Sequence, residues 1–450
     1  MSIDELENNR REIKKITIEI IDNVKKRMDL AKKIGDIKQR YGLSIIDNEK
    51  ERELRSSIMD YSNKIGLDPN FASRLLNLLI DESRRLQSKD EESITPTQIF
   101  VKSKELERSG KKIIHLEIGE PDLDPPIIVG KALNEAIEKK RYRYTEAAGI
   151  IELRDAIAKR LGVEYKDVII TPGGRFGVYL AISLLSYGDE IIVIDPSWPA
   201  YKDCARLRGV SVRTIKSKED DWSINLDNLK DAINSNTKMI VLNYPNNPTG
   251  KILDEESMNG IVELARRYRI TILSDEVYSY YAFKEYKSIA SYDDVDYILI
   301  SSFSKAYSMT GFRVGFVVSN NTSYLKRMIK HQSIALTSVA EPMQYAALKA
   351  LEGDHKVYSS IMKKRLDYLA ERLGAMQLSF YKPDGGMYIF AKSRKEDFNS
   401  LKFASSLLEK GVAVTPGVAF GEYNNYIRIS ACNDEAMLKE GLDILEESLR

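Results

Sequence analysis

Cysteine and histidine are scarce in this 450-residue sequence, which holds two cysteines and three histidines. Cys204 and Cys432 have no paired spacing, so we expect no disulfide framework. His115, His331 and His355 are scattered along the chain, so the sequence contains no cluster of histidine and cysteine that could bind a metal. We therefore expect no bound metal and a reducing, cytoplasmic location.

Long apolar runs and an excess of one charge are also missing. No run approaches the roughly 20 residues that a membrane-spanning helix needs, and the first residues, MSIDELENNRREIKK, contain no apolar signal segment. The net charge is +1, with 43% hydrophobic and 30% charged residues. Because this balance creates no bulk attraction to polyanions, we expect neither nucleic acid nor a membrane as a partner.

The chain has two regions with different sequence patterns, and the pattern of the first region predicts helices only. From Ile13 to Ile34 apolar residues recur every three or four positions, and neither proline nor glycine interrupts residues 3–34. A helix of roughly 35 residues without an internal cap indicates a bundle or an intertwined dimer. Asp47 is the expected N-cap of a second helix, and Pro69 the expected first residue of a third. We predict an all-α domain over residues 1–88.

The second region begins after a polar stretch, SKDEESITPTQ, which predicts a linker over residues 89–98. In residues 99–450, short apolar runs such as DEIIVID, KMIVLNY and DYILISS alternate with amphipathic helical segments. This alternation predicts an α/β fold with a mostly parallel central sheet covered by helices on both faces. We expect a large domain at about 125–322 and a smaller α+β domain from about 99–124 and 323–450.

Polar clusters follow the predicted strands, where ligands bind in open α/β sheets. VIITPGGRFGVYLAI combines a strand, a Gly-rich turn and a helix start that could hold a phosphate. LNYPNNPTG adds amide side chains, and TILSDEVYSYY adds Asp275 and Tyr278. Lys305 follows DYILISS, with Arg313 nearby. Each cluster alone fits an ordinary turn, cap or exposed lysine, but together they supply what pyridoxal phosphate requires.

Several of these motifs carry a family resemblance. IGEPDLDPP, YTEAAGIIELRDAIA, TPGG, YPNNPTG, SDEVY, SFSKAYSMTGFRVG and YIRIS occur in this order. With them, residues 95–450 resemble the fold-type I pyridoxal-phosphate aminotransferases of the aspartate aminotransferase-like family. The resemblance implies that Lys305 binds the cofactor covalently and shuttles the substrate α-proton. It also implies that Asp275 pairs with the pyridinium N–H, while Tyr278 and Asn247 bind the ring 3-oxygen.

The same resemblance implies the remaining contacts of this site. Gly174 and Arg175 would offer backbone donors to the cofactor phosphate, and Ser302 and Arg313 a hydroxyl and a guanidinium. The other expected contacts are Trp198 stacked on the ring, Tyr144 reaching the phosphate of the partner subunit, Arg428 clamping the substrate α-carboxylate, and Gly119 beside the substrate. No residue matches the second arginine with which some members bind a distal carboxylate, so the specificity for the distal group stays open.

The N-terminal charges allow two interpretations. Arg27 and Lys38 share a helix face, whereas Arg10 lies too far along the helix to reach the same small ligand unless two antiparallel copies combine. By itself this pattern is typical of a solvated coiled coil. However, IDELENNRREIKKI, NVKKRMDLAKKIGDIKQRYGLSIIDNEKERE and ESRRLQ resemble the all-helical chorismate mutases over their full length.

The mutase resemblance implies a cationic site for chorismate. Its expected contacts are Arg10 (from the partner chain) and Arg27 on the carboxylates, Lys38 and Gln87 at the ether oxygen, Asp47 and Glu51 at the hydroxyl region, and Ser83 on a carboxylate. Lys50 stands where the family usually has arginine. Such a pocket suits a pericyclic rearrangement, which needs a selected conformer and stabilisation of developing negative charge rather than a nucleophile.

The combined resemblance predicts a bifunctional enzyme of aromatic amino-acid biosynthesis that forms a homodimer or a higher homo-oligomer. It would convert chorismate to prephenate and transaminate prephenate, phenylpyruvate or 4-hydroxyphenylpyruvate, with glutamate or aspartate as amino donor. One alternative is an aspartate aminotransferase regulated by a non-catalytic mutase-like sensor. Another is a transcription regulator whose basic residues 25–33 bind DNA, which is disfavoured because groove-reading motifs need short helices and acids alternate with these bases.

Overall fold

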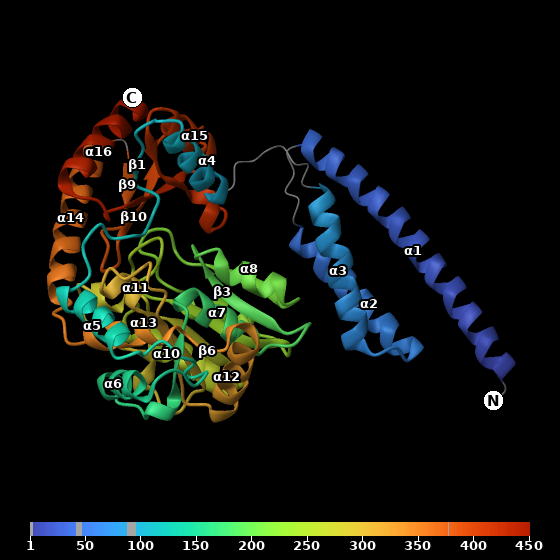
Figure 1. Ribbon diagram of the computed structural model, residues 1–450. Helices are drawn as coiled ribbons and strands as arrows, with labels where there is room; N and C mark the ends of the chain where they lie inside the picture. Colours follow the sequence, from blue (N-terminus) through green and yellow to red (C-terminus); the bar gives the residue numbers. More distant parts are fainter. Residues whose placement is uncertain (1–2, 42–46, 88–95, 377) are drawn as a thin grey trace. The chain divides into compact units, whose positions relative to one another are not determined.

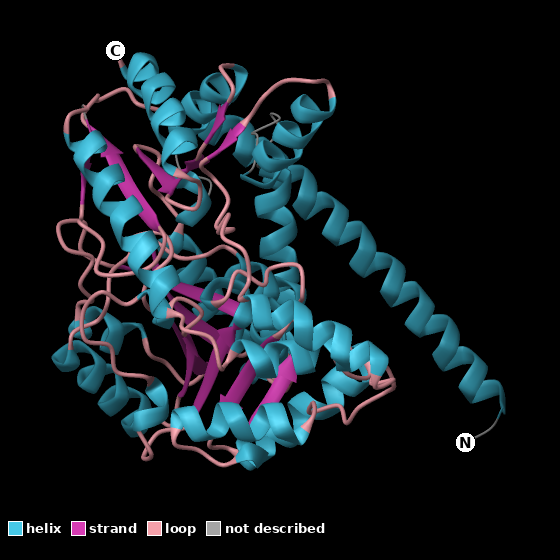
Figure 2. Cartoon of the chain, turned by 60° about the vertical axis from the view of Figure 1, so that its left-hand side comes forward, coloured by secondary structure: helices cyan, strands magenta, loops and turns pink. Residues whose placement is uncertain are grey.

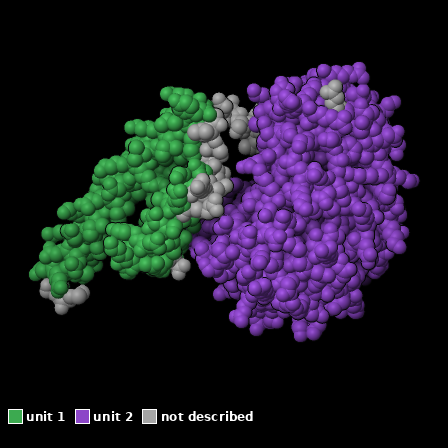
Figure 3. Space-filling model, turned by 180° about the vertical axis from the view of Figure 1, so that it is seen from behind, with its two compact units in different colours: residues 1–93 green, residues 94–450 purple. Residues whose placement is uncertain are grey.

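The computed structural model describes residues 3–41, 47–87, 96–376 and 378–450, in two compact units of residues 1–93 and 94–450 (Figures 1 and 3). Most of the predicted linker, 89–98, lies outside the described residues. Its last three residues instead form the start of helix α4 (Pro96–Arg108). Pro96 begins this helix because proline lacks the N–H that a first turn leaves unpaired. The predicted end of the linker at 98 is therefore wrong.

Unit 1 is all α-helical, as predicted. Its helices are α1 (Ile3–Arg40), α2 (Asn48–Ile65) and α3 (Pro69–Gln87). Helix α1 runs unbroken for 38 residues, about 57 Å at 1.5 Å per residue. The Asp47 side chain caps α2 by accepting a hydrogen bond from the Lys50 N–H, and Gly66 ends this helix in the left-handed conformation.

Helix α1 is buried only toward its C-terminal end, at Met28, Ala31 and Gly35. A Cβ atom at Gly35 would lie 2.8 Å from the Gln87 Cα, so glycine permits the close approach of α1 to α3. The earlier part of the helix exposes a series of apolar side chains: Ile3, Leu6, Ile13, Ile16, Ile18, Ile20 and Ile21. An exposed apolar stripe of this size is typical of a protein–protein contact.

Unit 2 contains a seven-stranded sheet in the order β2-β8-β7-β6-β5-β3-β4 (Figure 2). All neighbouring pairs are parallel except those of β8, which is antiparallel to both β2 and β7, so the predicted mostly parallel sheet is confirmed. The strands are β2 (Val168–Thr171), β3 (Glu190–Asp195), β4 (Ser211–Lys216), β5 (Thr237–Asn243), β6 (Thr271–Asp275), β7 (Tyr297–Ser302) and β8 (Gly315–Ser319).

Helices cover both faces of this sheet (Figure 2). In β3, Ile192 and Ile194 belong to one apolar cluster and Ile191 and Val193 to another, so alternate side chains enter the two halves of the core. The helices between α4 and the end of this domain are α5 (Ile127–Glu138), α6 (Ile151–Leu161), α7 (Gly174–Ile182), α8 (Ala200–Leu207), α9 (Leu226–Ala232), α10 (Glu255–Tyr268), α11 (Phe303–Ala306), α12 (Thr322–Leu336) and α13 (Glu341–Ala350).

The remaining elements surround a second core. It holds a four-stranded sheet, β12-β13-β10-β9, and a two-stranded parallel pair, β1-β11. The strands are β1 (Ile114–His115), β9 (Leu378–Phe380), β10 (Tyr388–Ser393), β11 (Val412–Ala413), β12 (Thr415–Pro416) and β13 (Tyr426–Ser430), with helices α14 (Lys356–Gly374), α15 (Ser400–Glu409) and α16 (Glu435–Leu449).

The predicted start of the small domain at residue 323 needs correction. In α12, Leu325 and Met328 pack in one large-sheet cluster, and Ala346 and Ala347 of α13 pack in the other. The large domain therefore continues through α13, because these apolar helix faces cover the large sheet. After Tyr281, the next buried residue of the second core along the chain is Met362, in α14. Within the described residues no helix is both long and apolar enough to cross a membrane.

Candidate active site

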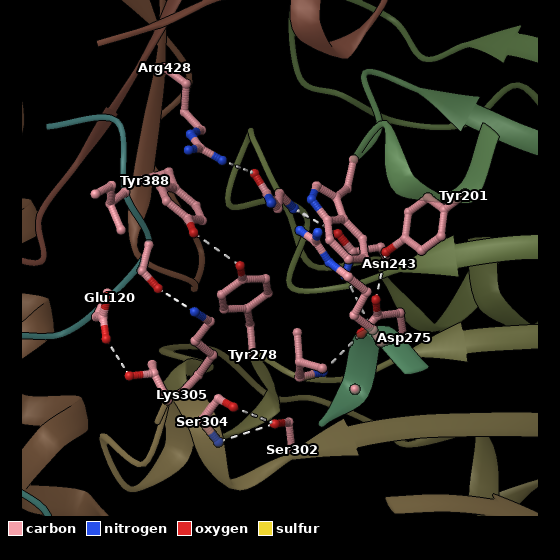
Figure 4. A pocket seen from close by; sticks show the side chains of 18 of the residues that line it. Glu120, Tyr201, Asn243, Asp275, Tyr278, Ser302, Ser304, Lys305, Tyr388 and Arg428 are labelled. Atoms are coloured by element: carbon pink, nitrogen blue, oxygen red, sulfur yellow. Dashed lines mark hydrogen bonds between the residues drawn. The ribbon is translucent and has the colours of Figure 1, made fainter. Parts of the chain in front are cut away.

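A cavity of about 430 Å³ opens at the carboxyl ends of the central strands of unit 2 (Figure 4). Asn243 and Asp275 end β5 and β6 as register partners, and Ser302 ends β7. The cavity brings together most of the residues singled out in unit 2: Gly119, Gly174, Arg175, Trp198, Asn247, Asp275, Tyr278, Ser302, Lys305, Arg313 and Arg428. Tyr144 is not among them and is 88% exposed in the single chain.

Lys305 lies in α11, directly after the Ser302 cap, and its amine points across the cavity (Figure 4). The Nζ atom donates a hydrogen bond to the Gly119 carbonyl. Desolvation lowers the pKa of this amine, and the nearby cations Arg428 and Arg313 lower it further. A lowered pKa enriches the uncharged amine, which is the nucleophilic form that attacks a carbonyl.

Asp275 is a buried carboxylate beneath the cavity. Its Oδ2 accepts a hydrogen bond of 2.7 Å from the Tyr201 hydroxyl, and its Oδ1 one of 3.3 Å from the Val277 N–H. Burial raises the pKa of Asp275 to about 6, although both hydrogen bonds oppose the shift. No charged partner among the described residues offsets the burial of Asp275, so a cationic ring N–H would stabilise its charged form.

The Gly-rich turn before α7 forms one end of the cavity. Gly173 has a φ of 83°, and a Cβ atom there would lie 2.7 Å from the Arg313 Nη2. A side chain at this position would therefore occupy the space beside the guanidinium. The N-terminal N–H groups of α7, the Ser302 hydroxyl and Arg313 form a donor set that suits a dianionic phosphate.

Trp198 and Arg175 form an adjacent wall of the cavity. The Arg175 Cζ lies 4.9 Å from the Trp198 ring centroid, within the range of a cation–π contact. The resemblance implied only a backbone role for Arg175, whereas its side chain also lines the cavity. A flat aromatic wall is suited to a planar ring such as a pyridine.

Arg428, in β13, is buried on the opposite side of the cavity. Its Nη1 donates to Asn247 Oδ1 at 2.8 Å, and its Nη2 donates to Thr415 Oγ1 at 3.1 Å and to the Glu117 carbonyl. Its Nε is buried and has no hydrogen-bond partner among the residues that the structure describes. A buried donor left unpaired is costly, and a substrate carboxylate would satisfy it.

Two tyrosines of this site, Tyr201 and Tyr388, were not predicted from the sequence motifs. Tyr201 binds Asp275, and its only local signal is its helical spacing from Trp198 in SWPAY. The Tyr388 hydroxyl lies 3.0 Å from the Tyr278 hydroxyl, and its ring centroid lies 4.1 Å from the Arg428 Cζ. Tyr388 reaches the cavity from the small domain, which local sequence does not indicate.

In unit 1 the structure brings together part of the second predicted site. Arg27 Nη1 donates to the Leu79 carbonyl at 2.6 Å and to the Ser83 hydroxyl, and burial lowers the Arg27 pKa. Gln87 lies on the same helix as Ser83, and its Oε1 is buried with no hydrogen-bond partner in the described part of the chain. A half-buried guanidinium and a buried polar atom without a partner, both in the α1–α3 region, are consistent with a polar ligand site.

The other residues of that predicted site are more dispersed. Arg10 is exposed and pairs with Glu7 at 2.7 Å. Asp47 caps α2, Glu51 lies in its first turns, and Lys38 lies near the end of α1. Lys50, the residue that departs from the mutase pattern, pairs with Glu53 at 2.8 Å. Within one chain the structure does not bring Arg10 to the Arg27 cluster.

A fold with this sheet, a buried lysine, a carboxylate and a phosphate cradle at its strand ends defines a pyridoxal-phosphate enzyme of fold type I. Comparison with known families is specific: residues 111–445 match the aminotransferase class I and II family model. Residues 9–88 match the chorismate mutase type II model. The chain belongs to the class I and II aminotransferases and carries a chorismate mutase domain, so it is an enzyme of both kinds.

Relatives over the aminotransferase region agree with this assignment. An aspartate aminotransferase of Thermotoga maritima is 35% identical over 368 residues, which are 78% of this chain and 95% of that protein. A "Probable aspartate/prephenate aminotransferase" of Aquifex aeolicus is 34% identical, over 78% of this chain and 94% of its own. The crystal structure of an aromatic aminotransferase from Pyrococcus horikoshii aligns with a TM-score of 0.72 at 32% identity, covering 75% and 95% of the two chains.

Proposed function

We propose that the chain carries out two steps of aromatic amino-acid biosynthesis: chorismate to prephenate, and transamination of prephenate or an aromatic 2-oxo acid with glutamate or aspartate as donor. The observation that carries this proposal is the union of the two family matches in one chain. The fusion joins in one chain a unit that would make prephenate and a unit that exchanges amino and oxo groups.

In the aminotransferase unit, pyridoxal phosphate supplies an electron sink for a carbanion at the substrate α-carbon. Asp275, oriented by its hydrogen bond from Tyr201, would supply the negative charge that pairs with the ring N–H. The Lys305 amine would remove the α-proton of the substrate and later give it back, as general base and then general acid. Arg428 would bind the α-carboxylate of the substrate through its guanidinium. The Nε–H has no partner among the described residues, and the Nη1 atom donates to Asn247 Oδ1.

The phosphate would be held by the turn before α7 together with Ser302 and Arg313, and the pyridine ring would lie against Trp198. Gly174 and Arg175 contribute the N-terminal N–H groups of that helix. Because the backbone N–H groups and the buried Ser302 hydroxyl are held in place by the fold, this donor set would position the ring before substrate arrives, which removes an entropic cost from the reaction.

In the mutase unit, Arg27 and Ser83 would bind a carboxylate of chorismate, and Lys38 and Gln87 would face its ether oxygen. Asp47 and Glu51 would take the hydroxyl region, and Arg10 would come from the partner chain. The exposed apolar stripe of α1 supports a homodimer, because the described residues of unit 1 leave these apolar side chains exposed. Tyr144 would likewise act in the partner's site, which agrees with its exposure.

The acceptor is the finer part of the proposal. A relative named as an aspartate/prephenate aminotransferase and a structural neighbour named as an aromatic aminotransferase support an aromatic or prephenate acceptor. The aspartate aminotransferase name of another relative supports oxaloacetate as the second candidate.

Product identification tests the choice directly. The holoenzyme is incubated with chorismate and either glutamate or aspartate, and the amino acid formed is identified by mass spectrometry. Arogenate is expected if prephenate is the acceptor, and phenylalanine or tyrosine if the 2-oxo acids are. A kcat/KM panel that shows turnover of oxaloacetate alone, with none of prephenate or the aromatic 2-oxo acids, would contradict the proposal.

A further inference from the structure

Tyr388 lies where several parts of the aminotransferase site meet, although none of the sequence motifs of that site includes this residue. It is the first residue of β10 and pairs with Ser430 of β13, the strand that carries Arg428. Its side chain is 3% exposed and lines the cavity. In Figure 4 it stands between Arg428 and Tyr278, on the small-domain side of the site.

The Tyr388 hydroxyl forms a hydrogen bond with the Tyr278 hydroxyl, 3.0 Å away, and the two rings meet edge to face at 80°. Burial raises the pKa of both phenols, so both remain neutral and each has a single proton to donate. Only one of these protons can lie between the two oxygens. If Tyr388 donates it, the Tyr278 proton is free to point at another acceptor.

We infer that Tyr388 is a positioning residue that donates to Tyr278 and thereby directs the Tyr278 O–H toward the 3-oxygen of the bound cofactor ring. The inference rests on the proposed role of Tyr278. An anionic ring oxygen is a stronger acceptor than a neutral phenol, so binding of the cofactor sets the direction of the hydrogen-bonded chain. A phenol that accepts one hydrogen bond also becomes a better donor of the next.

The ring of Tyr388 has a second contact that its hydroxyl does not make. The Arg428 Cζ lies over the ring, 4.1 Å from its centroid, which is within the range of a cation–π contact. One side chain thus holds both the arginine proposed to bind the substrate carboxylate and the tyrosine proposed to bind the cofactor. Hydroxyl and ring can be removed separately by substitution.

Gly119 shows how tightly this position is enclosed. A Cβ atom there would lie 1.7 Å from the Tyr388 hydroxyl oxygen and 2.8 Å from its Cζ. Any larger residue at 119 would displace the phenol. The expected place of Gly119 beside the substrate therefore has a second explanation, which is space for Tyr388.

The test compares Tyr388→Phe, Tyr278→Phe and the double variant as holoenzymes without substrate, by pH titration of the cofactor's visible absorption. A hydrogen bond to the ring oxygen stabilises the deprotonated chromophore, so its loss raises the titration midpoint. We expect an upward shift of about half to one pH unit for Tyr388→Phe, as for the loss of one neutral hydrogen bond. We expect a larger shift for Tyr278→Phe, and none beyond it in the double variant.

Tyr426→Phe is the matched control, because it removes a buried hydroxyl of the same sheet that binds Glu219 instead. It should leave the midpoint unchanged. For the ring contact, Tyr388→Phe should keep the amino-donor KM within about twofold, while Tyr388→Leu should raise it about 3- to 30-fold.

An unshifted midpoint in Tyr388→Phe would overturn the inference, and so would a further shift when Tyr388→Phe is added to Tyr278→Phe. An unshifted midpoint in Tyr278→Phe would remove the role of Tyr278 and the inference with it. Neither result concerns the acceptor, since these titrations contain no substrate, so failure here is distinct from failure of the proposed pathway role.

Discussion

At the scale of single residues, burial decides the chemistry of unit 2. The Lys305 amine and the Asp275 carboxylate are ordinary side chains, and both acquire altered pKa values because the cavity removes them from water. The shift of Lys305 favours the uncharged amine, and that of Asp275 disfavours a charge until a cationic partner arrives. Both shifts lead to predictions for single substitutions.

Lys305→Ala should abolish transamination, with a loss of about 10²–10⁴-fold or more, because both the covalent anchor and the proton carrier disappear. The same preparation should convert chorismate at the wild-type rate, since Lys305 belongs to unit 2. Both rates are measured on one sample, with Lys326→Ala, an exposed lysine of α12, as control. Retained transamination would rule out Lys305 as the anchor.

Asp275→Asn should stabilise the cofactor-free protein above pH 6 while lowering transamination. The folded-state pKa, about 6, is raised above the ordinary value of 3.8, so burial of the charged carboxylate reduces stability as pH rises through 6. We expect a gain of roughly 1–3 kcal/mol at pH 8 and little difference at pH 4.

Thermal unfolding of the cofactor-free Asp275→Asn protein at the two pH values measures this difference. Asp203→Asn, an exposed carboxylate in α8, is the control. A variant less stable than wild type at pH 8 would contradict the assignment of burial as the dominant cause.

At the scale of elements, β1 is joined to its surroundings by a histidine bridge. His115 Nδ1 lies 2.8 Å from Glu117 Oε1, and its Nε2 lies 2.9 Å from Glu107 Oε1 in α4. Carboxylates only accept, so both ring nitrogens must carry protons. The hydrogen bond to Glu117 is the largest cause that raises the His115 pKa, and Glu107, itself paired with Lys104, adds to it.

The bridge predicts a pH-dependent stability of unit 2. Because the folded-state pKa is raised above 6.5, the bridge stabilises fully below about 6.5 and is lost as pH rises through the folded value. His115→Asn should cost roughly 1–2 kcal/mol at pH 6 and less at pH 9. Thermal unfolding across this range measures it, with His331→Asn, on α12, as control. A pH-independent difference between variant and wild type would be incompatible with the bridge.

At the scale of the whole molecule, the mutase site is predicted to need two chains, with Arg10 from one and Lys38 from the other. Arg10→Ala and Lys38→Ala should each be inactive in chorismate conversion. Mixing and reassociating them should restore about a quarter of wild-type activity, because half of the random dimers would hold one intact site out of two. The rate of prephenate formation measures the recovery.

The control for this mixing experiment is Arg27→Ala with Lys38→Ala. These two residues would come from the same chain, so no mixed dimer contains an intact site and no activity should return. Recovery in the control, or none in the Arg10 mixture, would show that the site is not shared in the proposed way.

The sequence by itself determined the classes of both reactions, because their residues lie in contiguous motifs. The run SSFSKAYSMTGFRVGF holds Ser302, Lys305 and Arg313, and a strand followed by a turn is enough to place them at the end of a sheet. The unbroken periodicity of residues 3–34 likewise sufficed for a long helix, since helix formation depends on local spacing.

Only the tertiary structure decided which distant elements meet. Local pattern assigned α12 and α13 to the small domain, whereas their apolar faces pack on the large sheet. Tyr388 follows an unremarkable turn, yet folding puts its hydroxyl against Gly119 and Tyr278 and its ring against Arg428. The physical reason is that the local sequence shows which helix faces and side chains are apolar enough to be buried. Which distant residues bury them depends on the topology of the whole chain.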